Sequence, residues 1–172
     1  MKFFTPEMFI RLHASDPDAA DQADEAWEAV LSRYRRRLDR IHLILPRAIR
    51  HLASDLLLHD ADVLNLAHEN GRFVIVLRLS APPCRTVILT YRLVSDPKID
   101  IAALPSLSCS SEVKWLYDEG DVVAGKKQYR HNILLSNGWE LRLQFREVNI
   151  FEAVGLLPSM HEIQRSTAMQ SA

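Results

Sequence analysis

The sequence predicts an α+β domain in which N-terminal helices pack on an antiparallel meander sheet of about six strands. Three observations predict it. Residues 17–45 have helical periodicity, the period changes to alternation after residues 59–60, and Asn-Gly turns separate neighbouring alternating runs. The strands are connected too closely for βαβ crossovers, which argues against a parallel sheet.

The helical part begins with a short helix within residues 1–14, for which Pro6 is a good first helical residue. A second start at Asp16-Pro17 opens the long helix, about 17–45, which packs on the sheet through one apolar stripe. Pro46 ends this helix, and residues 47–57 form another. The stripe consists of Trp27, Val30, Leu31, Tyr34, Leu38, Ile41 and Leu45.

The first hairpin is predicted at Asn70-Gly71, between alternating residues 62–68 and 72–79. Asn and Gly tolerate positive φ, so a two-residue turn fits. This register sets three apolar or aromatic pairs opposite one another: Leu64 with Leu77, Leu66 with Ile75, and His68 with Phe73.

Two further strands are expected at residues 85–94 and 112–118, both of which alternate. The segment 96–111 between them reads as irregular, with one turn around 99–104. Residues 119–127 read as a Gly-containing loop.

The last hairpin has a three-residue loop, residues 136–138, with Gly138 left-handed. A two-residue Asn-Gly turn would mix the apolar and polar faces, whereas the longer loop places His131 opposite Leu143 on one apolar face. The second strand should continue from Val148 to about Phe151, and a final turn follows. We expect Gly138→Val to be poorly tolerated and Gly138→Asn to be milder.

Composition fits one domain over residues 1–158, with residues 159–172 as a flexible tail. The apolar fraction is 48% and the net charge is −1, so no basic field recruits nucleic acid. No apolar run is long enough for a membrane helix, and the acidic residue at position 7 leads us to expect no secretory signal. The two cysteines, in no metal-binding spacing, indicate a reduced cytoplasm. No cofactor motif is present.

The catalytic candidates are two histidines near carboxylates. His131 with Asp118 and Glu119 could act as a general base, although no nucleophile stands at a known spacing. His59-Asp60 resembles the metal-binding step of HD-type phosphohydrolases, but those enzymes take their ligands from several helices, and here a strand follows. A core histidine and a turn pair are the simpler interpretations, no metal site is predicted, and whether the protein is an enzyme stays open.

The binding candidates are arginines on two surfaces. One row shares a helix face by its spacing, and a pair lies on the outer face of the last hairpin. A solvated face or a contact surface for an acidic partner explains both. The row consists of Arg33, Arg36, Arg37 and Arg40, and the pair of Arg130 and Arg142.

Several stretches resemble a small uncharacterised bacterial family, a domain of unknown function with no assigned activity. They are M-K-F-F-T-P-E, E-A-W-E with Y-R-R-R-L, L-H-D-A-D-V-L, W-L-Y-D-E and H-N-I-L-L-S-N-G-W-E-L. The resemblance implies a bacterial, cytoplasmic protein and transfers no site residue. We therefore expect a non-catalytic protein-interaction or accessory (immunity-type) module; the alternative is a small hydrolase that uses His131 or His59 with nearby carboxylates. The oligomeric state does not follow from the sequence.

Overall fold

The computed structural model of the chain describes residues 1–13, 16–79, 83–104 and 112–154. The expected tail and the turn after the last strand fall mostly outside these ranges. The helices are α1 (Pro6–Leu12), α2 (Pro17–Ile41), a 3-10 turn η1 (His42–Ile44) and α3 (Arg47–Ser54). The strands are β1 (Asp62–Glu69), β2 (Arg72–Leu79), β3 (Arg85–Leu93), β4 (Lys98–Ile101), β5 (Trp115–Val122), β6 (Tyr129–Leu135) and β7 (Trp139–Val154).

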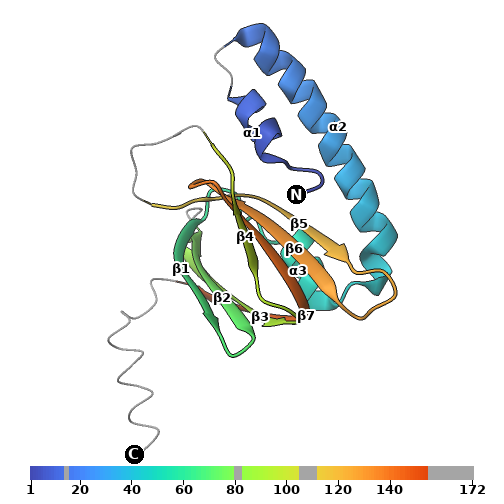
Figure 1. The fold of residues 1–172 in the computed structure, drawn as a ribbon, viewed down its shortest axis with the longest axis vertical. Helices are drawn as coiled ribbons and strands as arrows, with labels where there is room; N and C mark the ends of the chain where they lie inside the picture. The colour runs from blue at the N-terminus through green and yellow to red at the C-terminus, as the bar shows by residue number, and fades with distance from the viewer. Residues whose placement is uncertain (14–15, 80–82, 105–111, 155–172) are drawn as a thin grey trace, which may run out of the picture.

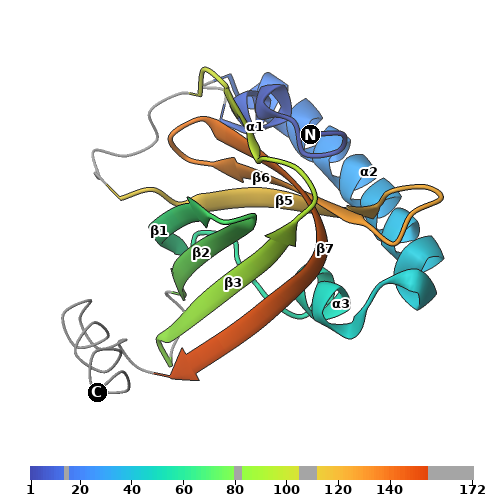
Figure 2. The same ribbon diagram turned by 60° about the horizontal axis from the view of Figure 1, so that its bottom comes forward.

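The sheet is antiparallel, in the order β1-β2-β3-β7-β6-β5, with β4 added beside β7. Two meanders, β1–β3 and β5–β7, meet where β3 pairs with β7. The 16-residue β7 is long enough to pair with β6 along its first half and with β3 along its second half. The sheet curves strongly into a half-barrel, so its concave face can enclose a core (Figures 1 and 2).

The two ends of the sheet meet at the start of β1 and β5. Asp62 forms an isolated bridge with Lys114. The backbone N–H of Val63 donates to Val113 O at 2.8 Å, and that of Trp115 donates to Ala61 O at 2.9 Å. These bonds close one end of the half-barrel and satisfy backbone groups that an edge strand would leave unpaired.

The main core lies inside the half-barrel and beneath α3. Alternate residues of each strand point inward, as the period of two requires, and Ile49 and Leu52 of α3 cover them. Fully buried strand residues include Ile75, Leu77, Val87, Leu89, Tyr91, Trp115, Ile133, Leu141, Leu143 and Phe145.

A second apolar cluster lies between α2 and β5, where the N-terminal segment is inserted (Figure 1). Phe4 packs in T-shaped geometry on Tyr34, with centroids 5.2 Å apart. Trp27 is half-buried, and its ring centroid lies 4.6 Å from that of Tyr117. The part of α2 that contains Trp27 and Tyr34 therefore packs on the N-terminal segment and on β5, while Ile41 at its end reaches the main core.

The α+β class, the antiparallel sheet and both hairpin turns agree with the sequence-based predictions. The long helix ends at Ile41, and a 3-10 turn carries the chain to Leu45. The last hairpin has the predicted register, with His131 opposite Leu143 and Gly138 at φ +85°. In the first hairpin Leu66 pairs with Ile75 as expected.

Three local predictions were wrong. A bulge between Val63 and Asn65 sets Val63, not Leu64, opposite Leu77. The segment expected to be irregular contains β4, which pairs with the start of β7. The segment expected to be a loop after residue 118 continues as β5 to Val122, so its carboxylates lie on a strand.

Candidate functional site

His131 belongs to a buried polar network on the concave face of the sheet. Its Nδ1 lies 2.8 Å from the hydroxyl of Tyr91, and its Nε2 lies 3.0 Å from Oδ2 of Asp118. The indole N–H of Trp115 donates to the other oxygen of Asp118 at 3.0 Å. The structure thus brings together His131 and Asp118, two of the predicted catalytic candidates.

This network has the geometry of a base oriented by a carboxylate, but its third member is a phenol without access to substrate. Burial, together with the charge of Asp118, raises the pKa of Tyr91. His131 is 1% exposed, and the gap beside it, bordered by Ile49 and Gly120, holds no space for a water molecule. The contacts of His131 therefore satisfy buried polar groups of the fold.

Glu119 points away from His131 because neighbouring residues of a strand face opposite sides. It is buried, and its carboxylate accepts the backbone N–H groups of Lys2, at 2.9 Å, of Phe3, and of Phe4, at 2.7 Å. A carboxylate that accepts several amides is held firmly. Glu119 fixes the N-terminal segment and does not join a catalytic group with His131.

His59 and Asp60 form an exposed pair at the turn before β1. His59 Nδ1 lies 2.9 Å from Asp60 Oδ2, and Asp60 has φ +64°. The neighbouring Asp62 turns instead to Lys114 and Arg78, whose Nη2 is 2.8 Å away. Within the described ranges no group of three or more His, Cys, Asp and Glu side chains could hold a metal ion.

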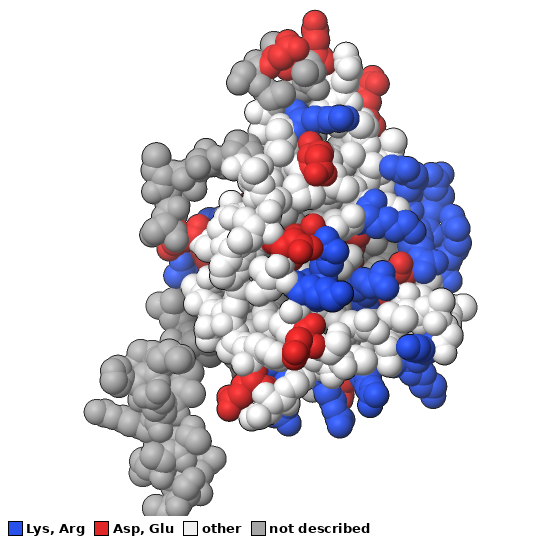
Figure 3. Space-filling model, viewed as in Figure 1, with Lys and Arg blue, Asp and Glu red and all other residues white. Residues whose placement is uncertain are grey.

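The predicted arginine row lies along the second half of α2. Arg33, Arg36 and Arg40 are exposed, and Arg37 pairs with Asp121 of β5 at 2.6 Å. Basic side chains gather on this side of the molecule, at the right of Figure 3. The row is a convex, charged helix face.

Arg130 and Arg142 border a hollow of about 400 Å³ on the outer face of β6 and β7, next to β4. A smaller group of basic side chains is visible near the middle of the same view (Figure 3). We call this the β4–β7 hollow. Its lining residues are Met1, Lys2, Ser95, Asp96, Lys98, Arg130, Asn132, Arg142, Leu143 and Gln144.

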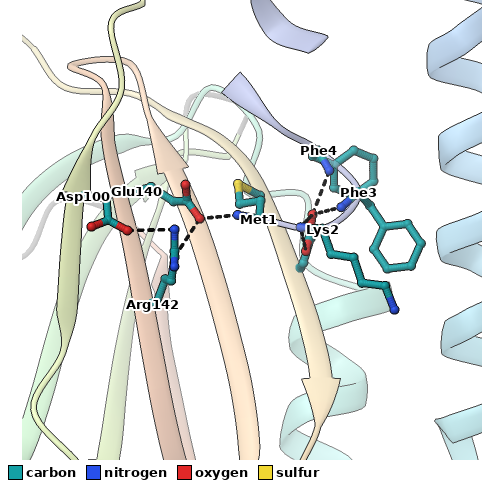
Figure 4. A network of polar contacts seen from close by, with 8 residues as sticks. Met1, Lys2, Phe3, Phe4, Asp100, Glu140 and Arg142 are labelled. Carbon is teal, nitrogen blue, oxygen red and sulfur yellow. Dashed lines mark hydrogen bonds and ion pairs between the residues drawn. The ribbon is translucent and has the colours of Figure 1, made fainter. Parts of the chain in front are cut away.

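One cation of the hollow is already neutralised. Arg142 contacts Asp100 at 2.7 Å and Glu140 at 2.9 Å, and Glu140 also binds the α-amino group of Met1 (Figure 4). Burial alone would raise the pKa of Glu140, but the two cations outweigh burial and lower it. The negative charges of Glu140, first, and of Asp100 raise the pKa of Arg142.

Other groups of the hollow are left without such partners in the described chain. Arg130 and Lys98 are exposed, and neither makes an ion pair with a described residue. Asn132 Oδ1 is buried in the same wall and has no hydrogen-bond partner.

Sequence reasoning found the two arginines of the hollow but missed Lys98, because it did not predict β4. The short alternation of residues 98–101 was the available signal. No helix of the described ranges combines the length and apolarity needed to cross a membrane. Comparison of the chain with protein-family models and with curated proteins gives no match, so the family resemblance stays an expectation.

Proposed function

We propose that the protein is a non-catalytic interaction module of the bacterial cytoplasm, of accessory or immunity type, whose β4–β7 hollow binds an acidic segment of a partner protein. One observation carries the proposal. Arg130 and Lys98 border a concave surface, and neither makes an ion pair with a described residue. Carboxylates are the groups that would satisfy such donors.

The mixed charge of this surface favours a protein partner over a nucleic acid. Asp96 lines the hollow, and Asp100 and Glu140 hold Arg142 beside it. A phosphate backbone repeats its charge along its length and would meet these acids, whereas a protein segment can place single carboxylates opposite single cations. The net charge of −1 supplies no attraction for nucleic acid over the whole surface.

The hollow is a better binding site than the arginine row of α2. A concave surface contacts a ligand from several sides and removes water from the new ion pairs, which strengthens them. The exposed arginines of a helix face stay hydrated and contribute little per pair. Arg37 is also occupied by Asp121.

The test is co-purification of the full chain from its native host, followed by dissociation constants for the stoichiometric partner found. Arg130→Glu should weaken binding by about tenfold or more, since a cation is replaced by a like charge. Arg36→Glu on α2 and Arg72→Glu on β2 are matched controls and should bind like the parent. A loss confined to Arg36→Glu would move the interface to α2 and contradict the proposal.

The hydrolase alternative needs an observation of its own, and among the described residues the His131–Asp118 contact favours it. A panel of p-nitrophenyl esters and phosphates tests it with the parent and with His131→Gln. If neither protein turns over any of these substrates, the result supports the non-catalytic proposal. Turnover by the parent that His131→Gln abolishes, while the variant keeps its folded circular dichroism, would overturn it.

A further inference from the structure

The second half of β7 has one edge that no strand of the described ranges pairs with, and we call it the free edge. The pairing of β6 with β7 ends at Tyr129 and Phe145, whereas β3 pairs with the opposite edge of β7 as far as Val154. Along residues 146–154, no described strand lies on the β6 side. A strand edge presents N–H and C=O groups that another extended chain can pair with.

α3 lies beside this free edge (Figure 2). A hollow of about 710 Å³ lies beside the contact between the helix and the strand, and Val148, Asn149 and Ile150 of β7 line it. We call it the β7–α3 groove. An extended chain needs about 4.8 Å of space beside its neighbour, so an open groove along the strand suits one.

The helix side of the groove is basic. Arg47 and Arg50 line it, and neither forms an ion pair within the described ranges. His51 is already bound on both sides, by Asp55 and by Glu152, each at 3.0 Å. The groove therefore offers two available guanidinium groups next to an unpaired strand edge.

We propose that the β7–α3 groove binds an extended acidic segment of a partner polypeptide, which adds to β7 as a further strand. Backbone hydrogen bonds to β7 would supply the pairing, and carboxylates on one face of the segment would contact Arg47 and Arg50. This site is separate from the β4–β7 hollow and does not depend on the function proposed for it.

Charge favours a foreign acidic segment over a second copy of this chain. Two copies paired through this edge would bring the same arginines toward each other, and like charges oppose association. The free edge also carries Arg146 besides Glu147 and Glu152, and Glu152 is bound by His51 and Arg85. The partner segment should therefore supply the negative charge.

The probe is a fluorescent decapeptide of alternating Glu and Val, titrated with the full chain by anisotropy. The control peptide alternates Glu and Pro, so it has the same charge but cannot pair as a strand because proline lacks the N–H. We expect the Glu-Val peptide to bind at least tenfold more tightly. Equal binding of both peptides, or no binding up to about 1 mM, would overturn the proposal.

Protein variants and hydrogen exchange locate the binding. The double variant Arg47→Glu, Arg50→Glu should lose at least tenfold in affinity, while Arg72→Glu on β2, which lines neither the groove nor the β4–β7 hollow, should not change it. In the parent, the peptide should slow amide exchange within residues 146–150. Protection confined to another strand, or a peptide-free dimer in analytical ultracentrifugation with those amides already protected, would refute strand addition by a partner.

Discussion

Gly138 closes the turn between β6 and β7 and also touches the chain that follows β4. Its φ is +85°, a conformation that residues with a Cβ rarely adopt. A Cβ on Gly138 would lie 2.2 Å from the backbone oxygen of Ala102. The amide of Ala102 in turn donates to Gly138 O at 2.7 Å. Any side chain here must therefore push away the end of β4.

The cost of Gly138→Ala has two separable parts. Positive φ costs roughly 1–2 kcal/mol for an L residue. Moving Ala102 away also loses a backbone hydrogen bond, about 1 kcal/mol, and disturbs the pairing of β4. We expect a loss of about 2–4 kcal/mol in the free energy of unfolding. Gly125→Ala is the matched control, because Gly125 has φ +71° and its Cβ would meet nothing within 4 Å.

Urea unfolding followed by tryptophan fluorescence measures both variants. Gly125→Ala should show the strain of positive φ alone, and Gly138→Ala should unfold at a clearly lower urea concentration with an unchanged slope. Gly138→Asn was expected from the sequence to be mild; because the Cβ itself collides with Ala102, it should be nearly as damaging as Gly138→Ala. Equal midpoints for the Gly138 and Gly125 variants would refute the contact with Ala102.

Three further changes test the polar contacts. His131→Leu should lower the free energy of unfolding by about 2–3 kcal/mol because it leaves the Tyr91 hydroxyl buried without a partner, and adding Tyr91→Phe should recover part of the loss in urea unfolding. The contacts of Asp62, first that with Lys114, lower the pKa of its carboxyl group. The stabilisation by Asp62 is therefore complete above about pH 3.8 and is lost as the pH falls through the pKa of the folded protein. Asp62→Asn should be less stable than the parent at pH 7, and this difference should disappear in acid. Hydrogen bonds, first to Glu152, raise the pKa of His51. The contribution of His51 to stability is therefore complete below about pH 6.5 and is lost as the pH rises through the pKa of the folded protein. The melting temperature of the parent should fall over this pH range, and that of His51→Gln should not.

The hairpins could be predicted because their determinants are local. Asn70 and Gly71, both with positive φ, set the first turn, and Gly138 sets the last. Once a turn is fixed, alternation leaves one register that keeps apolar residues on one face. Leu64 departs from that register because the bulge lies where β1 meets β5, a contact made by residues far apart in the sequence.

β4 and the full length of β5 could not be predicted in the same way. β4 is four residues long, and its alternation is too short to mark a strand because Ile99 and Ile101 stay exposed instead of joining the core. Among the described strands it pairs with β7, which follows about forty residues later. Residues 119–127, with Glu119 and Asp121, were predicted as a Gly-containing loop, yet Glu119 accepts amides of the N-terminal segment and Asp121 pairs with Arg37 of α2. The sequence-based prediction grouped Asp118 and Glu119 with His131, but neighbouring residues of β5 face opposite sides, so only Asp118 contacts His131.

The length of β7 explains why two different surfaces lie on one strand. β7, with 16 residues, is longer than each strand it pairs with. Among the described strands, β4 and β6 pair with the two edges of its first half, and β3 pairs with one edge of its second half. The paired half can present only side chains to a ligand, and there Arg130 and Arg142 border the β4–β7 hollow. The unpaired half can present backbone groups as well, beside the arginines of α3. A proline-containing acidic ligand should therefore distinguish the two, because the hollow can accept its carboxylates whereas the β7–α3 groove also requires its amides.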